Sequence, residues 1–254
     1  MKKIFLPIFL FFNLTIYSQE LKSTKKIVRI NIDPLENIFL CEEKKIIKIN
    51  KSNNEKLEYD FSKYGKLNKI ITKNPFRTTV FFKESQTIIF LDKNLNKLNL
   101  ELKLQSIQNE IISDIETHSN LIFLLSEQSN TICVYDFKKL KTIHCNSKID
   151  IIKNKYLKLF LNQGSVFLLN DREILVLNEN LITLKKTKIE NCEKLFFNED
   201  SLYLIIKNNL FKSSIIDLNN LIFIKPIPKN NLFYIDKNVI FGIKNNFFLG
   251  RKIK

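Results

Sequence analysis

The sequence predicts an all-β fold, a six-bladed β-propeller of antiparallel four-stranded blades. Most short apolar runs are followed by a polar break and further apolar runs, as in SVFLL, EILVLN and LITLKK. Strands spaced so closely leave no room for crossover helices, so they must pair antiparallel. A repeat of about 40 residues holding several short strands is typical of a propeller blade. The repeat is marked by one aromatic residue in each blade: Phe39, Phe82, Phe123, Phe167, Tyr203 and Phe241.

The repeats divide the chain into six expected blades. The last is short and offers three strands, LFYID, VIFGI and NFFLG. We expect residues 25–32 (KKIVRINI) to pair with it as an N-terminal strand, because closing the ring removes an exposed sheet edge. Five blades is the alternative count. The apolar residues of 104–115 partly follow the spacing of a helix, but the stretch fits equally well a loop followed by a strand. The expected blades span 27–66, 67–106, 107–148, 149–191, 192–228 and 229–254.

Polar residues are expected to form the turns, because the chain has only four glycines. Asn and Asp tolerate left-handed backbone and bond to it locally, so Asn pairs such as 53–54, 219–220 and 230–231 suit this role. Four Asx residues follow apolar strands at similar positions. We expect their side chains to cap turns by accepting backbone N–H bonds, with a cation-binding acidic ring as the alternative. They are Asp92, Asp136, Asn178 and Asp217.

The N-terminus resembles a secretory signal peptide. Lys2 and Lys3 precede an apolar run over residues 4–14, which ends near Ser18 and Gln19. The run is shorter than the roughly 20 apolar residues that a membrane-spanning helix needs. We therefore expect a signal peptide at 1–19 and a single propeller domain at 20–254, exported to the periplasm or the outer envelope. An uncleaved anchor is the alternative, and no later stretch is long enough to span a membrane as a helix.

The formal net charge of +15 suggests an anionic partner. Two features weigh against this interpretation. Lysine carries most of the positive charge, whereas arginine is the preferred group for bidentate phosphate and base contacts. The lysines are also spread along the whole chain, as an AT-rich genome would produce. We expect no nucleic-acid specificity, and we keep an anionic glycan, lipopolysaccharide or DNA as alternative ligands.

The four cysteines have irregular spacing and no CxxC pair. Cys133 and Cys145 are placed to face each other across a hairpin, so a disulfide between them stays open. Cys41 and Cys192 have no such partner in sequence. His118 and His144 stand outside any ligand cluster, so we expect no metal and no cofactor.

Residues 33–136 carry a family resemblance. The motifs are DPLENIFL, YGKL at 64–67, NPFRTTVFF at 74–82, TIIFLDKNL at 87–95 and TICVYD at 131–136. This part resembles a family of exported, propeller-like proteins of Bacteroidota. The chain departs from the family at Cys133, where an aromatic such as Trp is usual, and it lacks several family glycines. The resemblance implies the fold and an exported setting, and it implies no particular activity.

The block Asn74-Pro75-Phe76-Arg77 is the most distinctive local motif. Pro75 fixes its own φ and keeps Asn74 out of the helical region, so the block forms a turn or a strand entry. We take Asn74, Phe76 and Arg77 as a candidate binding loop on the rim, with Arg77 presented to a ligand. The competing interpretation is a rigid connection in which Phe76 packs between blades.

Catalysis is not indicated by the sequence. No serine stands on a recognisable nucleophile elbow. The acidic pairs 42–43 and 199–200 are expected in solvated turns rather than on two sides of a sugar. We therefore expect a monomeric, non-enzymatic binding module for another protein or a polymer of the cell envelope. An enzyme would need His, Asp, Glu or Tyr side chains from several blades to converge at the mouth of the central channel.

Overall fold

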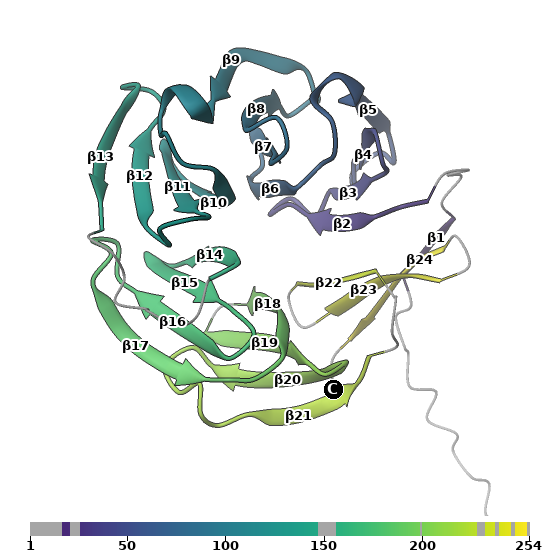
Figure 1. Ribbon diagram of the computed structural model, residues 1–254. Coiled ribbons are helices and arrows are strands. Elements are labelled where there is room, and N and C mark those ends of the chain that lie inside the picture. Colours follow the sequence, from purple (N-terminus) through teal and green to yellow (C-terminus); the bar gives the residue numbers. More distant parts are fainter. Residues whose placement is uncertain are drawn as a thin grey trace, which may run out of the picture.

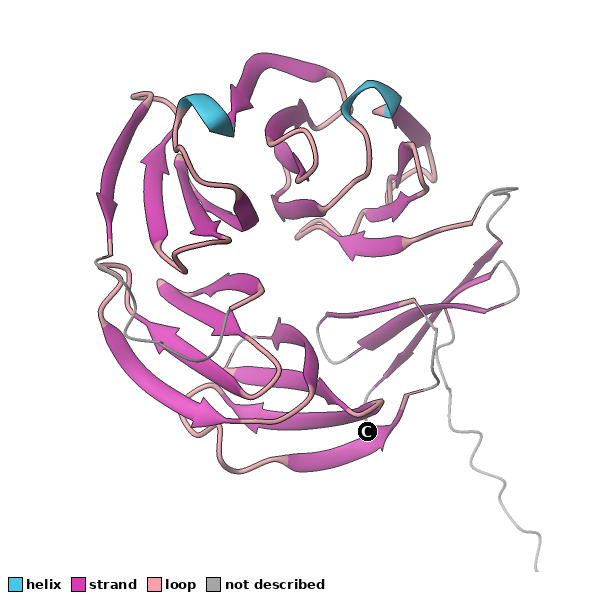
Figure 2. Ribbon diagram, in the orientation of Figure 1, coloured by secondary structure: helices cyan, strands magenta, loops and turns pink. Residues whose placement is uncertain are grey.

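The computed structural model describes residues 17–20, 26–146, 156–198, 200–227, 232–236, 239–244 and 247–252. It is an all-β propeller of antiparallel four-stranded blades. Figure 2 shows that the described chain is built almost wholly of strands. Five blades consist of four consecutive strands each: β2 (Arg29–Ile32), β3 (Ile38–Cys41), β4 (Lys45–Ile49) and β5 (Lys56–Asp60); β6 (Lys69–Asn74), β7 (Arg77–Phe82), β8 (Thr87–Asp92) and β9 (Lys97–Lys103); β10 (Ile112–His118), β11 (Leu121–Ser126), β12 (Ile132–Asp136) and β13 (Lys141–Cys145); β14 (Lys158–Asn162), β15 (Ser165–Leu169), β16 (Glu173–Leu177) and β17 (Thr183–Lys188); β18 (Cys192–Asn198), β19 (Ser201–Ile206), β20 (Asn209–Ser214) and β21 (Ile222–Pro226).

The ring is completed by a composite sheet from both ends of the chain. Strands β22 (Phe233–Asp236), β23 (Val239–Lys244) and β24 (Phe247–Lys252) pair in order, and β1 (Tyr17–Glu20) adds to β24 with Tyr17 opposite Gly250. The structure thus has five blades of consecutive strands, not the six predicted, plus this composite sheet.

The closing strand is not the predicted one. Residues 29–32 form β2, the first strand of the first blade, and pair with β3. The reason is burial: Ile30 and Ile32 pack with Leu40 and Ile49 in one core cluster. The closing strand is β1, whose first three residues belong to the segment 1–19 that was expected to be a signal peptide. Residues 1–16 of that segment lie outside the described residues.

The six sheets are arranged in a ring around a central axis, which we call the channel axis, with β2, β6, β10, β14, β18 and β22 nearest to it (Figure 1). Strand β2 contacts β6 and β22, β10 contacts β6 and β14, and β18 contacts β22. Strands β5, β9, β13, β17 and β21 form the outer rim.

Helical structure is limited in the described residues to two short 3-10 turns, η1 (Ser62–Tyr64) and η2 (Leu104–Ser106). The ambiguous stretch 104–115 is therefore η2, a loop and the start of β10. Within the parts of the chain that the structure describes, no helix is long and apolar enough to cross a membrane.

The core lies between neighbouring blades, because residues on the inner strands alternate between the two blade faces. The predicted aromatics Phe39, Phe123, Phe167 and Tyr203 are buried and pack toward the following blade. Phe82 is also buried but packs toward the preceding blade. The prediction that Phe82 stands at the same position of the repeat as the other aromatics was therefore wrong.

Asx side chains hold the turns, as predicted. Asp92 Oδ1 accepts the backbone N–H groups of Asn94 and Asn96, both at 2.8 Å. Asn178 Oδ1 accepts those of Asn180 and Ile182 at 3.0 and 2.9 Å. The shared pattern confirms the capping role. Asp136 does the same for Lys138 and Lys139, and Asp217 for Asn219.

Left-handed backbone is supplied by more residue types than predicted. Asn54 has φ 56°, as expected for a turn asparagine, whereas the pair 219–220 has no left-handed residue and 230–231 lies outside the described residues. Leu95 and Leu181 have φ 63° and 62° inside the two Asx turns. A leucine is costly there, so the paired amide bonds to the Asx oxygen hold a conformation that leucine alone would avoid.

The cysteine pair left open by the sequence forms a disulfide. Cys133 on β12 lies directly opposite Cys145 on β13, and their sulfurs are bonded. Cys41 and Cys192 are free thiols and both are buried. Burial raises the pKa of each to about 12, so neither is a thiolate near neutral pH.

Candidate functional site: one mouth of the central channel

A charged residue stands at the same register position on the inner strand of five blades. Each pairs with a residue of the second strand that packs toward the following blade. Because the inner strands follow one another around the ring in the same sense, these five positions lie at one level of the channel. The pairs are Arg29↔Cys41, Lys69↔Phe81, Asp114↔Leu125, Lys158↔Leu169 and Lys194↔Ile205. We call these five charged residues the mouth ring.

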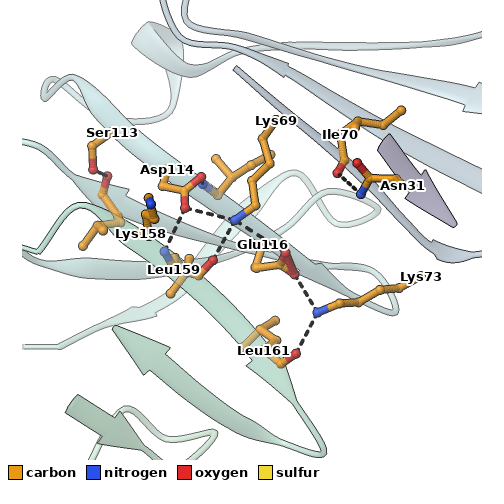
Figure 3. A network of polar contacts seen from close by, with 12 residues as sticks. Asn31, Lys69, Ile70, Lys73, Ser113, Asp114, Glu116, Lys158, Leu159 and Leu161 are labelled. Atoms are coloured by element: carbon orange, nitrogen blue, oxygen red, sulfur yellow. Dashed lines mark hydrogen bonds and ion pairs between the residues drawn. The ribbon is translucent and has the colours of Figure 1, made fainter. Parts of the chain in front are cut away.

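Lys69 links three blades within the channel (Figure 3). Its Nζ donates to Asp114 Oδ2 at 3.0 Å and to the backbone oxygen of Leu159 at 2.6 Å. The Leu159 N–H in turn donates to Asp114 Oδ2 at 2.8 Å. Both Lys69 and Asp114 are largely buried. Burial raises the pKa of Asp114, while Lys69 and the Leu159 amide oppose that effect.

A second lysine repeats this arrangement four positions further along β6, where its side chain is more exposed. Lys73 Nζ lies 3.0 Å from Glu116 Oε2 and donates to the backbone oxygen of Leu161 at 2.7 Å. Glu116 also lies 3.5 Å from Lys69 Nζ. Asp114 and Glu116 are therefore both engaged by lysine side chains.

The other three members of the mouth ring carry positive charge without an ionic partner. Among the described residues, Arg29, Lys158 and Lys194 form no ion pair with a carboxylate. Lys158 Nζ donates to the backbone oxygen of Glu193, and the Lys194 ammonium lies 4.9 Å from the centre of the Phe233 ring.

The cations lie close enough to influence one another. Burial lowers the pKa of Lys158, and Lys69 adds to this, against the carboxylates of Asp114 and Glu193. Burial also lowers the pKa of Lys194, and Lys158 and Arg29 add to this, against the carboxylate of Glu193. Both lysine residues are exposed to solvent. This is an arrangement that favours an anion.

The predicted rim loop sits at the tip of the β6–β7 hairpin. Asn74 Oδ1 accepts the N–H of Phe76 at 2.9 Å, which makes the predicted turn. Phe76 is 69% exposed, so it does not pack between blades as one interpretation required.

Arg77 turns inward instead of toward a ligand. Its guanidinium carbon lies 4.6 Å from the Phe137 ring centre and 5.7 Å from that of Phe90, and Nη2 donates to the backbone oxygen of Ser119. It therefore ties the second blade to the third. The exposed part of the predicted loop is Asn74 and Phe76.

The acidic pairs are placed differently from one another. Glu43 and Asp200 are exposed in turns, as expected, whereas Glu42 is buried and Glu199 lies outside the described residues. Glu42, Glu43 and Arg29 line part of a cavity of about 520 Å³ beside the first two blades. Among the described residues, no group of three or more His, Cys, Asp or Glu side chains could hold a metal ion.

The sequence interpretation missed the mouth ring. Four of its residues are lysine or arginine, which the abundance of lysine made uninformative one by one. A usable signal existed, because each of the five stands 11 or 12 positions before its strand partner. The blades can be aligned on the second-strand residue that packs toward the following blade, rather than on the most prominent aromatic. In that alignment the five charged residues fall at nearly the same position of the repeat.

Apolar side chains are exposed on the outer rim of the fourth and fifth blades. Lys185 Nζ on β17 donates to the backbone oxygen of Ile216 at 3.0 Å, which joins the two blades there. The exposed residues, which we call the outer-rim patch, are Ile182, Leu184, Ile216, Ile222 and Phe223.

Comparison with known proteins supports the propeller fold. Neither a protein-family model nor a curated protein matches the sequence. PorZ of Porphyromonas gingivalis, an essential bacterial surface component of the type-IX secretion system, is similar with a TM-score of 0.56 and 12% identity over 90% of this chain. The chain spans only 33% of PorZ.

Two further structures match over most of their own length. Virginiamycin B lyase from Staphylococcus aureus has a TM-score of 0.61 and 13% identity, covering 95% of this chain and 89% of the lyase. BamB from Moraxella catarrhalis has a TM-score of 0.55 and 8% identity, covering 90% and 86%. At these identities the likeness shows the fold alone.

Proposed function

We propose that the protein is an exported, non-enzymatic propeller that binds another protein of the cell envelope through its outer rim. The observation that carries this proposal is the outer-rim patch. Single apolar residues are normal on a protein surface. Five of them on the outer strands and adjoining turns of two neighbouring blades are typical of a protein contact site. Ile216 is 86% exposed, so its side chain has almost no contact within the monomer.

The disulfide supports the exported setting. Disulfides persist in oxidising compartments and are rare where thiol reductants are abundant. The bond between Cys133 and Cys145 is therefore consistent with a periplasmic or outer-envelope location. Among the structural neighbours, PorZ is described as a surface component of a secretion system, which agrees with an envelope role. Virginiamycin B lyase is an enzyme by name, so the fold itself is compatible with catalysis.

The proposal is tested by affinity capture from the native envelope at low and high salt. Bait proteins are the wild type, the variant I182S/F223S and a control variant L98S, which removes an exposed leucine from the second blade. We expect one protein partner that survives high salt with the wild type and L98S and is lost with I182S/F223S.

Two outcomes would overturn the proposal. Capture of anionic polymer alone, lost at high salt, would favour the electrostatic alternative. A partner retained equally by all three baits would place the contact elsewhere on the protein.

A further inference from the structure

The charge of the mouth ring is unbalanced on one side of the channel. Lys69 is neutralised by Asp114 and Glu116, as the distances of 3.0 and 3.5 Å show. Lys158 and Lys194 follow on the first strands of the next two blades, and Lys158 lies beside Asp114 (Figure 3). Asp114 lies within electrostatic reach of Lys158, but its Oδ2 is already occupied by Lys69 and the Leu159 amide.

The nearest further carboxylates do not complete the pairing. Glu193 is exposed, and it contacts Lys158 through its backbone oxygen rather than through its side chain. Glu43, which lines the same cavity as Arg29, is exposed in a turn. The ammonium groups of Lys158 and Lys194, from neighbouring blades, therefore lie close to a single carboxylate, that of Glu193, and Arg29 of the first blade is a third positive group within electrostatic reach.

Such an arrangement costs free energy in the absence of a counter-charge. Bringing like charges together in surroundings less polar than water disfavours their charged forms. A bound anion would offset that cost and would gain charge-assisted hydrogen bonds, since each ammonium offers donors beyond the one that Lys158 gives to Glu193.

We propose that this mouth of the channel binds a small phosphate-type anion, held by Lys158 and Lys194 with Arg29 as a third positive group. The site is distinct from the outer-rim patch, and neither proposal depends on the other. It also differs from general attraction of acidic polymers to the basic surface, because it requires these particular residues.

The test is calorimetric titration of the full chain with inorganic phosphate and with pyrophosphate, at low and constant ionic strength. The variant is K158M/K194M, and the matched control is K93M/K141M, which removes the same charge from exposed positions on the second and third blades. We expect saturable binding by the wild type and the control, and affinity weakened at least about tenfold in K158M/K194M, which corresponds to the loss of one charge-assisted hydrogen bond.

A second measurement uses the wild type alone, in case the variant is poorly folded. Lysines are acetylated briefly with and without phosphate, and the modified sites are read by mass spectrometry. Phosphate should protect Lys158 and Lys194 and leave Lys93 and Lys141 unchanged. The proposal is overturned by the absence of saturable binding in the wild type, by equal weakening in both variants, or by uniform protection of all four lysines.

Discussion

Removing the disulfide should destabilise the fold by a measurable amount. Cys133 and Cys145 are separated by 12 positions, so the bond closes a short loop in the unfolded chain. The chain-entropy estimate for a loop of this size is about 3 kcal/mol at 25 °C. For a domain of this length, that corresponds to a decrease in Tm of roughly 6–12 °C. The perturbation is the double variant C133S/C145S, and separately the addition of a phosphine reductant to the wild type.

Two assays check the reasoning. A thiol titration in guanidinium should find two reactive thiols in the unreduced wild type, from Cys41 and Cys192, and four after reduction. Thermal unfolding should show a lower Tm for the reduced wild type, while the reductant leaves the double variant unchanged. Four thiols before reduction, or a Tm that the reductant does not alter, would refute the argument.

Three further predictions concern the core, the surface and the free thiols. F167A removes a fully buried ring and should lower the free energy of unfolding by about 3–5 kcal/mol in urea titrations, whereas F76A at the exposed hairpin tip should change it by less than about 0.5 kcal/mol. Hydrogen bonds from Lys97 and Lys103 lower the pKa of Glu101 to about 2, so E101Q should cost about 1 kcal/mol above pH 4.5. This difference should shrink as the pH falls from 4.5 to about 2, because the wild-type carboxylate then becomes protonated in the folded state too; a difference at pH 2 as large as that above pH 4.5 would contradict the assignment. Cys41 should resist iodoacetamide at pH 8 in the native protein and react on unfolding, as mass spectrometry would show, since burial raises its pKa to about 12.

The propeller was predictable because its determinants are local and repeated. Each blade must bury one face against the next, so apolar strands recur with the blade length, and Phe39, Phe123 and Phe167 mark that repeat correctly. The Asx turns were predictable for the same reason, since Asp92 and Asn178 solve one local problem with the same pair of hydrogen bonds. Patterns of this kind are visible in a single sequence.

Features that depend on long-range pairing were harder to predict. Both β1 and β2 are short N-terminal segments, and the sequence did not indicate that β1 would pair with β24 across the whole length of the chain. The contacts of Arg77 with Phe137 and Phe90 were not predicted either, because they involve a neighbouring strand and the next blade. The mouth ring escaped notice since its members are far apart in sequence and meet only when the ring closes.

The contact of Lys69 with Leu159 has a mechanical consequence. It joins the second blade directly to the fourth, past the third, and Lys73 repeats the link at Leu161 (Figure 3). We expect these three blades to move as one stiff arc, so that any elastic opening of the ring is concentrated in the opposite arc, which contains the composite sheet. Lys158 lies at one border of the stiff arc, while Lys194 and Arg29 belong to the compliant one. The distance between these cations would then depend mainly on movements of the compliant arc, which contains the composite sheet.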